Sequence, residues 1–236
     1  MTDTDAVPCN QLLAALPAGT LRTLLREGAL NWVALSAADV LHEQGRRIDH
    51  VYFPVDAVIA FMAVATQRMT LEVGLIGDEG LAGIAVALGS MVSPVHAVVR
   101  RSGTALCAPA DAFRLALAQH SGLAQAVAHH AHGLMVQANQ AAFCSHFHLL
   151  EARLARSLLM MRDRVQSNAL HLTHEILGLA LGVRRVGITK AATSLQQRGL
   201  ISYSRGEIRI LDRKGLEVAS CGCYALVKKL AEAEVC

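Results

Sequence analysis

The feature that most constrains the fold is a change in the spacing of glycine and proline at Pro109. Between Trp32 and Pro109, short apolar segments alternate with turn residues. The breaks lie at Gly45, Pro54, Gly77, Gly80, Gly89, Pro94 and Gly103. Helices do not tolerate breaks this frequent, whereas an all-β roll or barrel requires them. The segments expected as strands are residues 31–35, 38–47, 50–54, 57–65, 70–77, 94–101 and 103–109.

After Pro109 the breaks become rare, and the chain is rich in Ala, Leu, Gln and His up to Leu159. A seven-residue stripe between His120 and Leu150 predicts one long helix that dimerises with a second copy. The predicted interface residues are Leu123, Val127, His130, Leu134, Gln137, Ala141, Cys144 and His148. Several of these are small or polar, so the alternative that this helix packs only on its own domain stays open.

The charge of the chain is divided unevenly. Residues 1–150 hold 8 Lys and Arg against 11 Asp and Glu, while residues 151–236 hold 14 against 8. A basic C-terminal third attached to a mildly acidic body is typical of a nucleic-acid-binding module joined to another domain.

The C-terminal third also has the order of a winged helix-turn-helix: helix, glycine turn, helix and β-hairpin. Thr173 is expected to cap a first helix that ends at Gly182. The second helix lies within 181–201, and the hairpin turns at Ser204, Arg205 and Gly206. The exposed face of the second helix would carry cationic side chains that form hydrogen bonds with guanine edges or phosphates. The residues expected at DNA are Thr173, Arg184, Arg185, Gly187, Thr189, Lys190, Ser204 and Arg205.

The run from Thr173 to Ile201, the roll-like segment before it and the long connecting helix resemble the Crp/Fnr family of bacterial transcription regulators. The resemblance covers about residues 30 to 220. It is strongest to an atypical branch in which HVYFP, EVGLIGDEG, LGVRR and a terminal CxCY, here Cys221 to Tyr224, recur.

The resemblance implies an α+β chain with an N-terminal β-roll (a jelly roll like those that bind cyclic nucleotides), a long dimerisation helix and a C-terminal winged helix-turn-helix. It implies a sensor domain at 1–119, the dimerisation helix at 120–149 and a DNA-binding domain at 150–236. The implied partners are a double-stranded DNA operator, a second copy of the chain and, for an activator, RNA polymerase. Arg185 and Lys190 match positions that contact bases or phosphates in the family. Val186 replaces an acidic base contact, and Arg184 stands where a capping serine is common.

Two other positions depart from the family. Gly83 falls where the family's ligand cassette carries a glutamate for the ribose, and Val95 falls where an arginine pairs the cyclic phosphate. Burying a phosphate without that arginine leaves an unpaired anion, which is costly. We therefore expect no binding of cyclic AMP in the usual mode.

The cysteines and histidines leave a second interpretation open. The six cysteines are expected to be reduced, and Cys221 and Cys223 to be structural. Eight of the eleven histidines lie between His120 and His174, and Cys144 and His148 are one helical turn apart. No four-ligand set with zinc-like spacing is visible in the sequence, so no metal ligand and no cofactor is predicted. A haem- or metal-dependent sensor of the same architecture stays an alternative.

The sequence also argues against membrane-spanning proteins, secreted proteins and enzymes. Its longest apolar run, Ala57 to Ala65, is nine residues, whereas a membrane span needs about 20. The acidic start MTDTD is not that of a secretory signal, so a cytoplasmic protein is expected. No catalytic residues are predicted, because no motif for a triad, phosphate loop or carboxylate pair is present. A ligand-binding protein with a degenerate helix-turn-helix is the other alternative.

Overall fold

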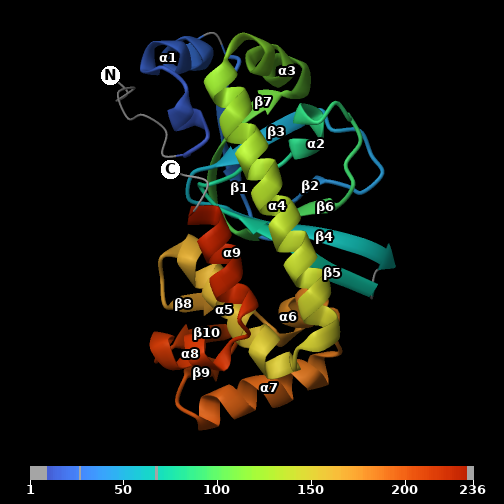
Figure 1. Cartoon of the computed structure of the whole chain (residues 1–236), viewed down its shortest axis with the longest axis vertical. Coiled ribbons are helices and arrows are strands. Elements are labelled where there is room, and N and C mark those ends of the chain that lie inside the picture. Colours follow the sequence, from blue (N-terminus) through green and yellow to red (C-terminus); the bar gives the residue numbers. More distant parts are fainter. Residues whose placement is uncertain (1–9, 27, 67–68, 233–236) are drawn as a thin grey trace. The chain divides into compact units, whose positions relative to one another are not determined.

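The computed structural model describes residues 10–26, 28–66 and 69–232 (Figure 1). Cys9 and Cys236, two of the cysteines expected to be reduced, lie outside the described residues. The chain forms two compact units, one of residues 1–60 with 76–132 and the other of residues 61–75 with 133–236. The predicted functional boundaries at 119 and 149 stay a prediction, since these units are defined by packing alone.

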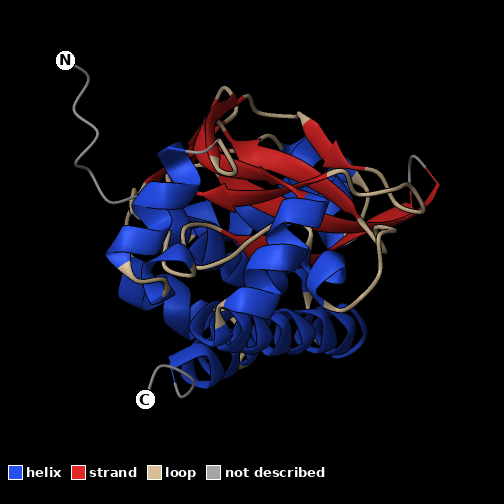
Figure 2. Cartoon of the chain, turned by 90° about the horizontal axis from the view of Figure 1, so that it is seen from above, coloured by secondary structure: helices blue, strands red, loops and turns tan. Residues whose placement is uncertain are grey.

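The described residues contain both helices and strands, as predicted (Figure 2). The first unit contains a 3₁₀ helix at Leu13–Ala15, α1 (Ala18–Arg26), β1 (Asn31–Leu35), β2 (Val40–His42), β3 (His50–Pro54), α2 (Ile84–Ala87), β6 (His96–Arg101), β7 (Gly103–Pro109) and α3 (Ala110–Gln119). Strand β4 (Val58–Thr66) begins in it. The expected strands are thus confirmed, although the one expected at 38–47 is reduced to Val40–His42.

The strands of the N-terminal part form two sheets, one with the order β1-β7-β3 and one with the order β2-β6-β4-β5. Strand β3 shows why its sequence folds this way, because Val51 and Phe53 alternate with more exposed residues and are almost fully buried. The Phe53 ring meets the Phe113 ring of α3 edge to face, with centroids 5.7 Å apart. These contacts centre the core of the first unit on β3, β7 and α3.

The second unit contains most of β5 (Met69–Ile76) and the C-terminal part of the long helix α4 (Ser121–Phe147). It continues with α5 (Leu150–Val165), β8 (Ala169–His171), α6 (His174–Leu181), α7 (Arg185–Gln197), β9 (Ile201–Ser204), β10 (Glu207–Ile210), α8 (Arg213–Ala219) and α9 (Cys223–Glu232). Its core is built on fully buried side chains: Leu154, Leu158, Ile188, Leu195, Ile208 and Leu216. Within the described residues, no helix has the length and apolar character that crossing a bilayer requires.

The long helix is confirmed, but its predicted seam faces the chain itself. Leu123 and Val127 belong to the core of the first unit, and Gln137, Ala141 and Cys144 are also buried within the single chain. Of the rest, His130 accepts a hydrogen bond from the Leu81 backbone N–H at 3.2 Å, and Leu134 and His148 are half-buried. Burial within one chain favours the alternative in which this helix packs on its own domain, because heptad spacing marks an apolar stripe without saying what covers it. The interface residues themselves stay a prediction. Intrachain packing accounts for that stripe.

Candidate nucleic-acid interface

The first helix of the helix-turn-helix begins at the predicted cap. The Thr173 side-chain oxygen accepts a hydrogen bond from the Ile176 backbone N–H at 3.2 Å. This bond satisfies one of the amide donors that a helix start leaves without a partner. Helix α6 ends at Gly182, whose φ of +65° is the left-handed conformation that glycine adopts without strain. Thr173 therefore supports the helix start, and its side chain is exposed.

The turn to the second helix is closely packed. The Val183 N–H donates to the Gly178 carbonyl oxygen at 2.9 Å. A Cβ added at Gly178 would lie only 2.9 Å from the Val183 oxygen. Because glycine has no side chain, the backbone at Val183 can pass close to α6 in the turn that leads to α7.

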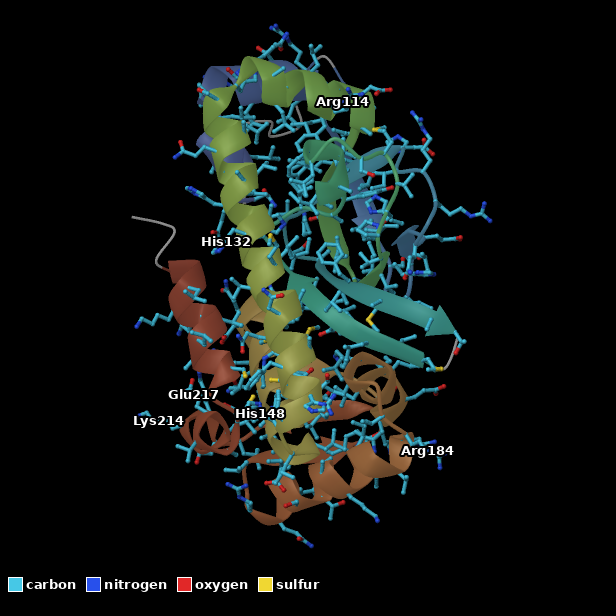
Figure 3. All side chains as sticks on the ribbon, turned by 45° about the vertical axis from the view of Figure 1, so that its right-hand side comes forward. Arg114, His132, His148, Arg184, Lys214 and Glu217 are labelled. Carbon is cyan, nitrogen blue, oxygen red and sulfur yellow. The ribbon has the colours of Figure 1, made fainter. Side chains whose placement is uncertain are left out.

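Helix α7 has one buried face and one exposed face. Ile188, Ala192 and Leu195 are buried, and they hold the helix on its own domain. Arg184, Arg185, Val186, Thr189 and Lys190 are exposed. Arg184 is the N-cap residue without a side-chain capping bond, and its side chain extends away from the ribbon (Figure 3). The structure thus places the predicted cations at the exposed start of the second helix.

Thr189 is exposed, but its hydroxyl already has partners. It donates to the Arg185 carbonyl oxygen at 3.1 Å, and it lies 3.0 Å from His174 Nδ1. With the hydroxyl proton on the carbonyl, the Thr189 oxygen accepts the Nδ1 proton. Thr189 therefore positions the helix-turn-helix in this structure, which the sequence pattern did not reveal.

His174 connects three elements of the domain. It begins α6, it reaches Thr189 on α7, and its ring stacks on Tyr203 of β9 at a centroid distance of 4.1 Å. Burial lowers the pKa of His174, and the positive charge of Arg185 adds to that effect. Its Nε2 is buried without a hydrogen-bond partner among the described residues, so the neutral ring is the form that fits.

Gly187 is closely packed against α5, and its predicted close approach to DNA stays a prediction. A Cβ at position 187 would lie 3.0 Å from Leu150 Cδ2 at the start of α5. This is closer than ordinary van der Waals contact, so a side chain at position 187 would require the Leu150 side chain to move by a few tenths of an ångström. Packing within the domain is the constraint at Gly187.

The predicted wing is a β-hairpin. Strands β9 and β10 pair antiparallel, with Ser204 opposite Glu207, and β8 pairs with the other edge of β10. The two turn residues, Arg205 and Gly206, have φ values of +48° and +86°. Turns with two left-handed residues match the twist of a tight hairpin. The side chains of Ser204 and Arg205 are exposed at this tip.

The exposed cations of this surface are available to an anion. Among the residues that the structure describes, Arg184, Arg185, Lys190 and Arg205 form no ion pair. Arg198, at the other end of α7, is instead paired with Glu151 of α5. We call Arg184, Arg185, Lys190 and Arg205 the cationic surface. Unpaired arginines and lysines beside helix starts are the groups that bind phosphates.

At Gly83, one of the two positions of the predicted degenerate ligand cassette, the structure leaves little room for a side chain. Gly83 has a φ of +107°, and a Cβ there would lie 2.8 Å from Val51 Cγ1. A glutamate at position 83 would therefore need both a strained backbone and a shifted core residue. At Val95, the backbone carbonyl accepts a hydrogen bond from Ser93 Oγ at 2.7 Å, and the side chain is half-buried.

One group of side chains was not predicted as a set. Cys144, His148, Cys221 and Cys223 converge in the second unit, with ligand atoms within 4.8 Å of one another. Burial raises the pKa of Cys144 and Cys223, against the opposite effect of the nearby Arg156 charge. The sequence signals were a Cys-x₃-His spacing and a Cys-x-Cys spacing. They lie about 75 residues apart, so only folding joins them.

Comparison with known proteins agrees with this geometry. Residues 152–219 match the Crp-like helix-turn-helix domain family. No curated protein sequence matches the chain. Among solved structures, a protein from Eubacterium rectale assigned to the crp/fnr family of transcriptional regulators has a TM-score of 0.70 at 18% identity, over 89% of this chain and 98% of the other.

Two further structures are similar. FixK2 from Bradyrhizobium japonicum has a TM-score of 0.70 at 13% identity, over 81% of this chain and 98% of FixK2. TTHA1359, a CRP/FNR-family transcriptional regulator from Thermus thermophilus, has a TM-score of 0.65 at 23% identity, over 86% and 98%. Residues 152–219 are therefore a Crp-like helix-turn-helix domain, carried by a chain with the fold of Crp/Fnr transcriptional regulators.

Proposed function

We propose that the chain is a DNA-binding transcriptional regulator that acts as a homodimer. The observation that carries this proposal is the cationic surface, which has Arg184, Arg185 and Lys190 at the exposed start of α7 and Arg205 at the tip of the wing. In this role α7 enters the major groove and Arg185 contacts a base edge or a phosphate. Arg184, Lys190 and Arg205 then contact backbone phosphates, which set affinity more than sequence preference.

Two copies are proposed because helix-turn-helix regulators read two half-sites about 34 Å apart, one with each copy. Because most of the predicted stripe on α4 is buried within the chain, we propose that the interface between the two copies uses another face of this helix. Met135, Phe143 and Phe147 are exposed at helical spacing on its C-terminal part, with Met135 62% and Phe147 65% accessible. Large apolar side chains exposed together on one helix are typical of a protein interface.

We also propose that the N-terminal unit senses a signal other than cyclic AMP bound in the usual mode. The support is the contact between the Gly83 position and Val51, together with valine at position 95 where the family carries a cation. Titration calorimetry with cyclic AMP and cyclic GMP tests this point. We expect no saturable binding at micromolar concentration, and saturable heat would overturn it.

The proposed DNA-binding activity is tested by the salt dependence of DNA binding. Purified chain is mixed with labelled duplexes recovered by selection from a random-sequence library, and Kd is measured at several salt concentrations. For a protein that neutralises phosphates, the logarithm of the association constant falls linearly with the logarithm of the salt concentration. The slope is about −0.9 for each phosphate contacted. We expect a steep negative slope and enrichment of a two-half-site sequence.

The same experiment identifies the competing interpretation. A ligand-binding protein whose helix-turn-helix serves only protein contacts would show weak duplex binding, little salt dependence and no enriched sequence. That combination would contradict the proposal.

A further inference from the structure

Four side chains that ligate metals meet in the second unit, although they come from two distant parts of the sequence. They are Cys144, His148, Cys221 and Cys223. His148 lies at the end of α4, close to sulfur atoms drawn in yellow (Figure 3). All three thiols are buried, at 2%, 7% and 5% accessibility in chain order, and His148 is half-buried. The group lies apart from the cationic surface of α7.

The local structure explains how each pair is presented. Cys144 and His148 are four residues apart, and the His148 N–H donates to the Cys144 carbonyl at 3.2 Å, which continues the helical turn. Their side chains therefore share one face of the helix end. Cys221 and Cys223 flank Gly222 in the connection from α8 to α9, and the Tyr224 N–H donates to the Cys221 carbonyl at 3.1 Å. This tight turn brings both thiols to the same side.

Three of the distances among the four ligand atoms are close to the edges of a tetrahedral metal site. With Zn–S bonds near 2.3 Å and Zn–N bonds near 2.0 Å, adjacent sulfurs are about 3.8 Å apart and sulfur and nitrogen about 3.5 Å apart. In the structure His148 Nδ1 lies 3.5 Å from Cys144 Sγ and 3.6 Å from Cys223 Sγ. Cys144 Sγ and Cys221 Sγ are 3.4 Å apart. A cation at the centre requires these two sulfurs to move slightly apart, and all four ligand atoms already lie within 4.8 Å of one another.

The surroundings carry the charge that such a site needs. Three thiolates, a neutral imidazole and a divalent cation have a net charge of −1, which is costly to bury alone. Arg153 and Arg156 of α5 lie near enough for their charges to act on Cys144. Arg156 is itself 9% exposed, and its Nε is buried without a hydrogen-bond partner among the described residues. A buried guanidinium next to the group therefore complements an anionic metal–thiolate centre.

We propose that Cys144, His148, Cys221 and Cys223 form a closed four-ligand site for Zn²⁺ that ties the end of α4 to the connection between α8 and α9. Three cysteines and one histidine are among the ligand sets of structural zinc sites, which keep no open position for chemistry. Binding of Zn²⁺ releases the three thiol protons to solvent, and the oxidation state of the zinc does not change. The site stabilises the packing of the second unit, whether or not DNA is bound.

The metal content of the full-length chain tests this proposal. The protein is purified under reducing conditions without chelators, incubated with Zn²⁺, desalted and analysed by mass spectrometry of its elements. We expect about one zinc per chain. Cys144→Ser and Cys223→Ser should reduce the bound zinc at least about tenfold, since each removes a direct ligand. Cys107→Ser is the matched control, because Cys107 is also buried but lies in the first unit, and it should keep wild-type zinc.

A second measurement on the wild-type chain does not depend on variants that fold. Cobalt replaces zinc after chelation, and tetrahedral thiolate coordination gives intense visible bands with sulfur-to-cobalt charge transfer in the near ultraviolet. Alkylation should modify Cys144, Cys221 and Cys223 much faster after chelation than before. The proposal is overturned if the wild-type chain takes up neither metal, if the serine variants retain full zinc, or if the reduced protein instead forms a Cys144–Cys221 disulfide in the presence of Zn²⁺.

Discussion

The imidazole Nδ1 of His174 lies 3.0 Å from the hydroxyl oxygen of Thr189, which joins the start of the first helix of the helix-turn-helix to the exposed face of the second. The same hydroxyl donates to the Arg185 carbonyl, so the bond fixes the backbone that carries Arg185. The position of the cationic surface therefore depends on a neutral, buried histidine.

His174 should make the second unit sensitive to acid. Because burial, with a smaller effect from the Arg185 charge, holds its folded-state pKa below the ordinary value of about 6.5, its contribution to stability is present above that pH and lost as pH falls. Its other close neighbours are Thr189 and Tyr203. We expect the free energy of unfolding to fall between about pH 7.5 and pH 5.

The matched variant for this prediction is His174→Gln, which keeps a polar side chain but cannot titrate. Denaturation of both proteins across the pH range should show a smaller acid loss in the variant. Identical pH dependence in the two proteins would mean that His174 does not titrate in a folding-linked way.

Thr173→Ala should destabilise the helix-turn-helix by about 1 kcal/mol, because it removes the capping bond to the Ile176 N–H. Chemical denaturation measures the change. Thr193→Ala, at an exposed position of α7, is the control and should stay within about 0.5 kcal/mol of wild type. Equal losses of stability in the two variants would contradict a capping role for Thr173.

Gly83→Ala should cost more stability than Gly89→Ala. Both glycines have a left-handed φ, at +107° and +86°, so both substitutions strain the backbone. Only at position 83 does a Cβ meet a core side chain, Val51, and such overpacking adds about 1–3 kcal/mol. Similar denaturation midpoints for the two variants would indicate that the cassette has room for a side chain, contrary to the structural argument against the usual ligand mode.

Met135→Glu should weaken the proposed homodimer. A carboxylate placed in an apolar seam must be desolvated, so we expect the dimer Kd to rise by about tenfold or more. Sedimentation over a concentration series measures this change. Met69→Glu is the control, because Met69 is 65% exposed on β5 and should leave association unchanged. A dimer unaffected by Met135→Glu would place the interface elsewhere.

The sequence predicted the elements well wherever local chemistry decides them. Strand ends follow the glycines and prolines, Thr173 caps α6, and the hairpin turns at Arg205 and Gly206, where glycine suits the left-handed position 206. The interface on α4 could not be predicted in the same way. Periodicity identifies Leu123 and Gln137 as one stripe, but whether the same chain or a partner covers that stripe depends on the tertiary fold.

The site residues also fall into two groups: those that local sequence pattern predicts and those whose role depends on tertiary contacts. Arg184, Arg185 and Lys190 were predicted because their exposure follows from the apolar face opposite them. The roles of Gly187 and Thr189 depend on contacts with Leu150 and His174, which no spacing rule encodes. The cysteine and histidine group was missed for the same physical reason, since its two halves are local motifs joined only by folding.

The central claim is that the exposed start of α7 binds DNA through Arg185. Its most direct test is the affinity of Arg185→Ala for the duplex selected by the wild-type chain, measured by fluorescence anisotropy at fixed salt. Arg114→Ala, an exposed arginine of α3 in the first unit, removes the same charge and is the control. We expect Arg185→Ala to lose about 1–3 kcal/mol of binding free energy and Arg114→Ala to stay near wild type. Equal affinity of both variants and wild type would contradict it.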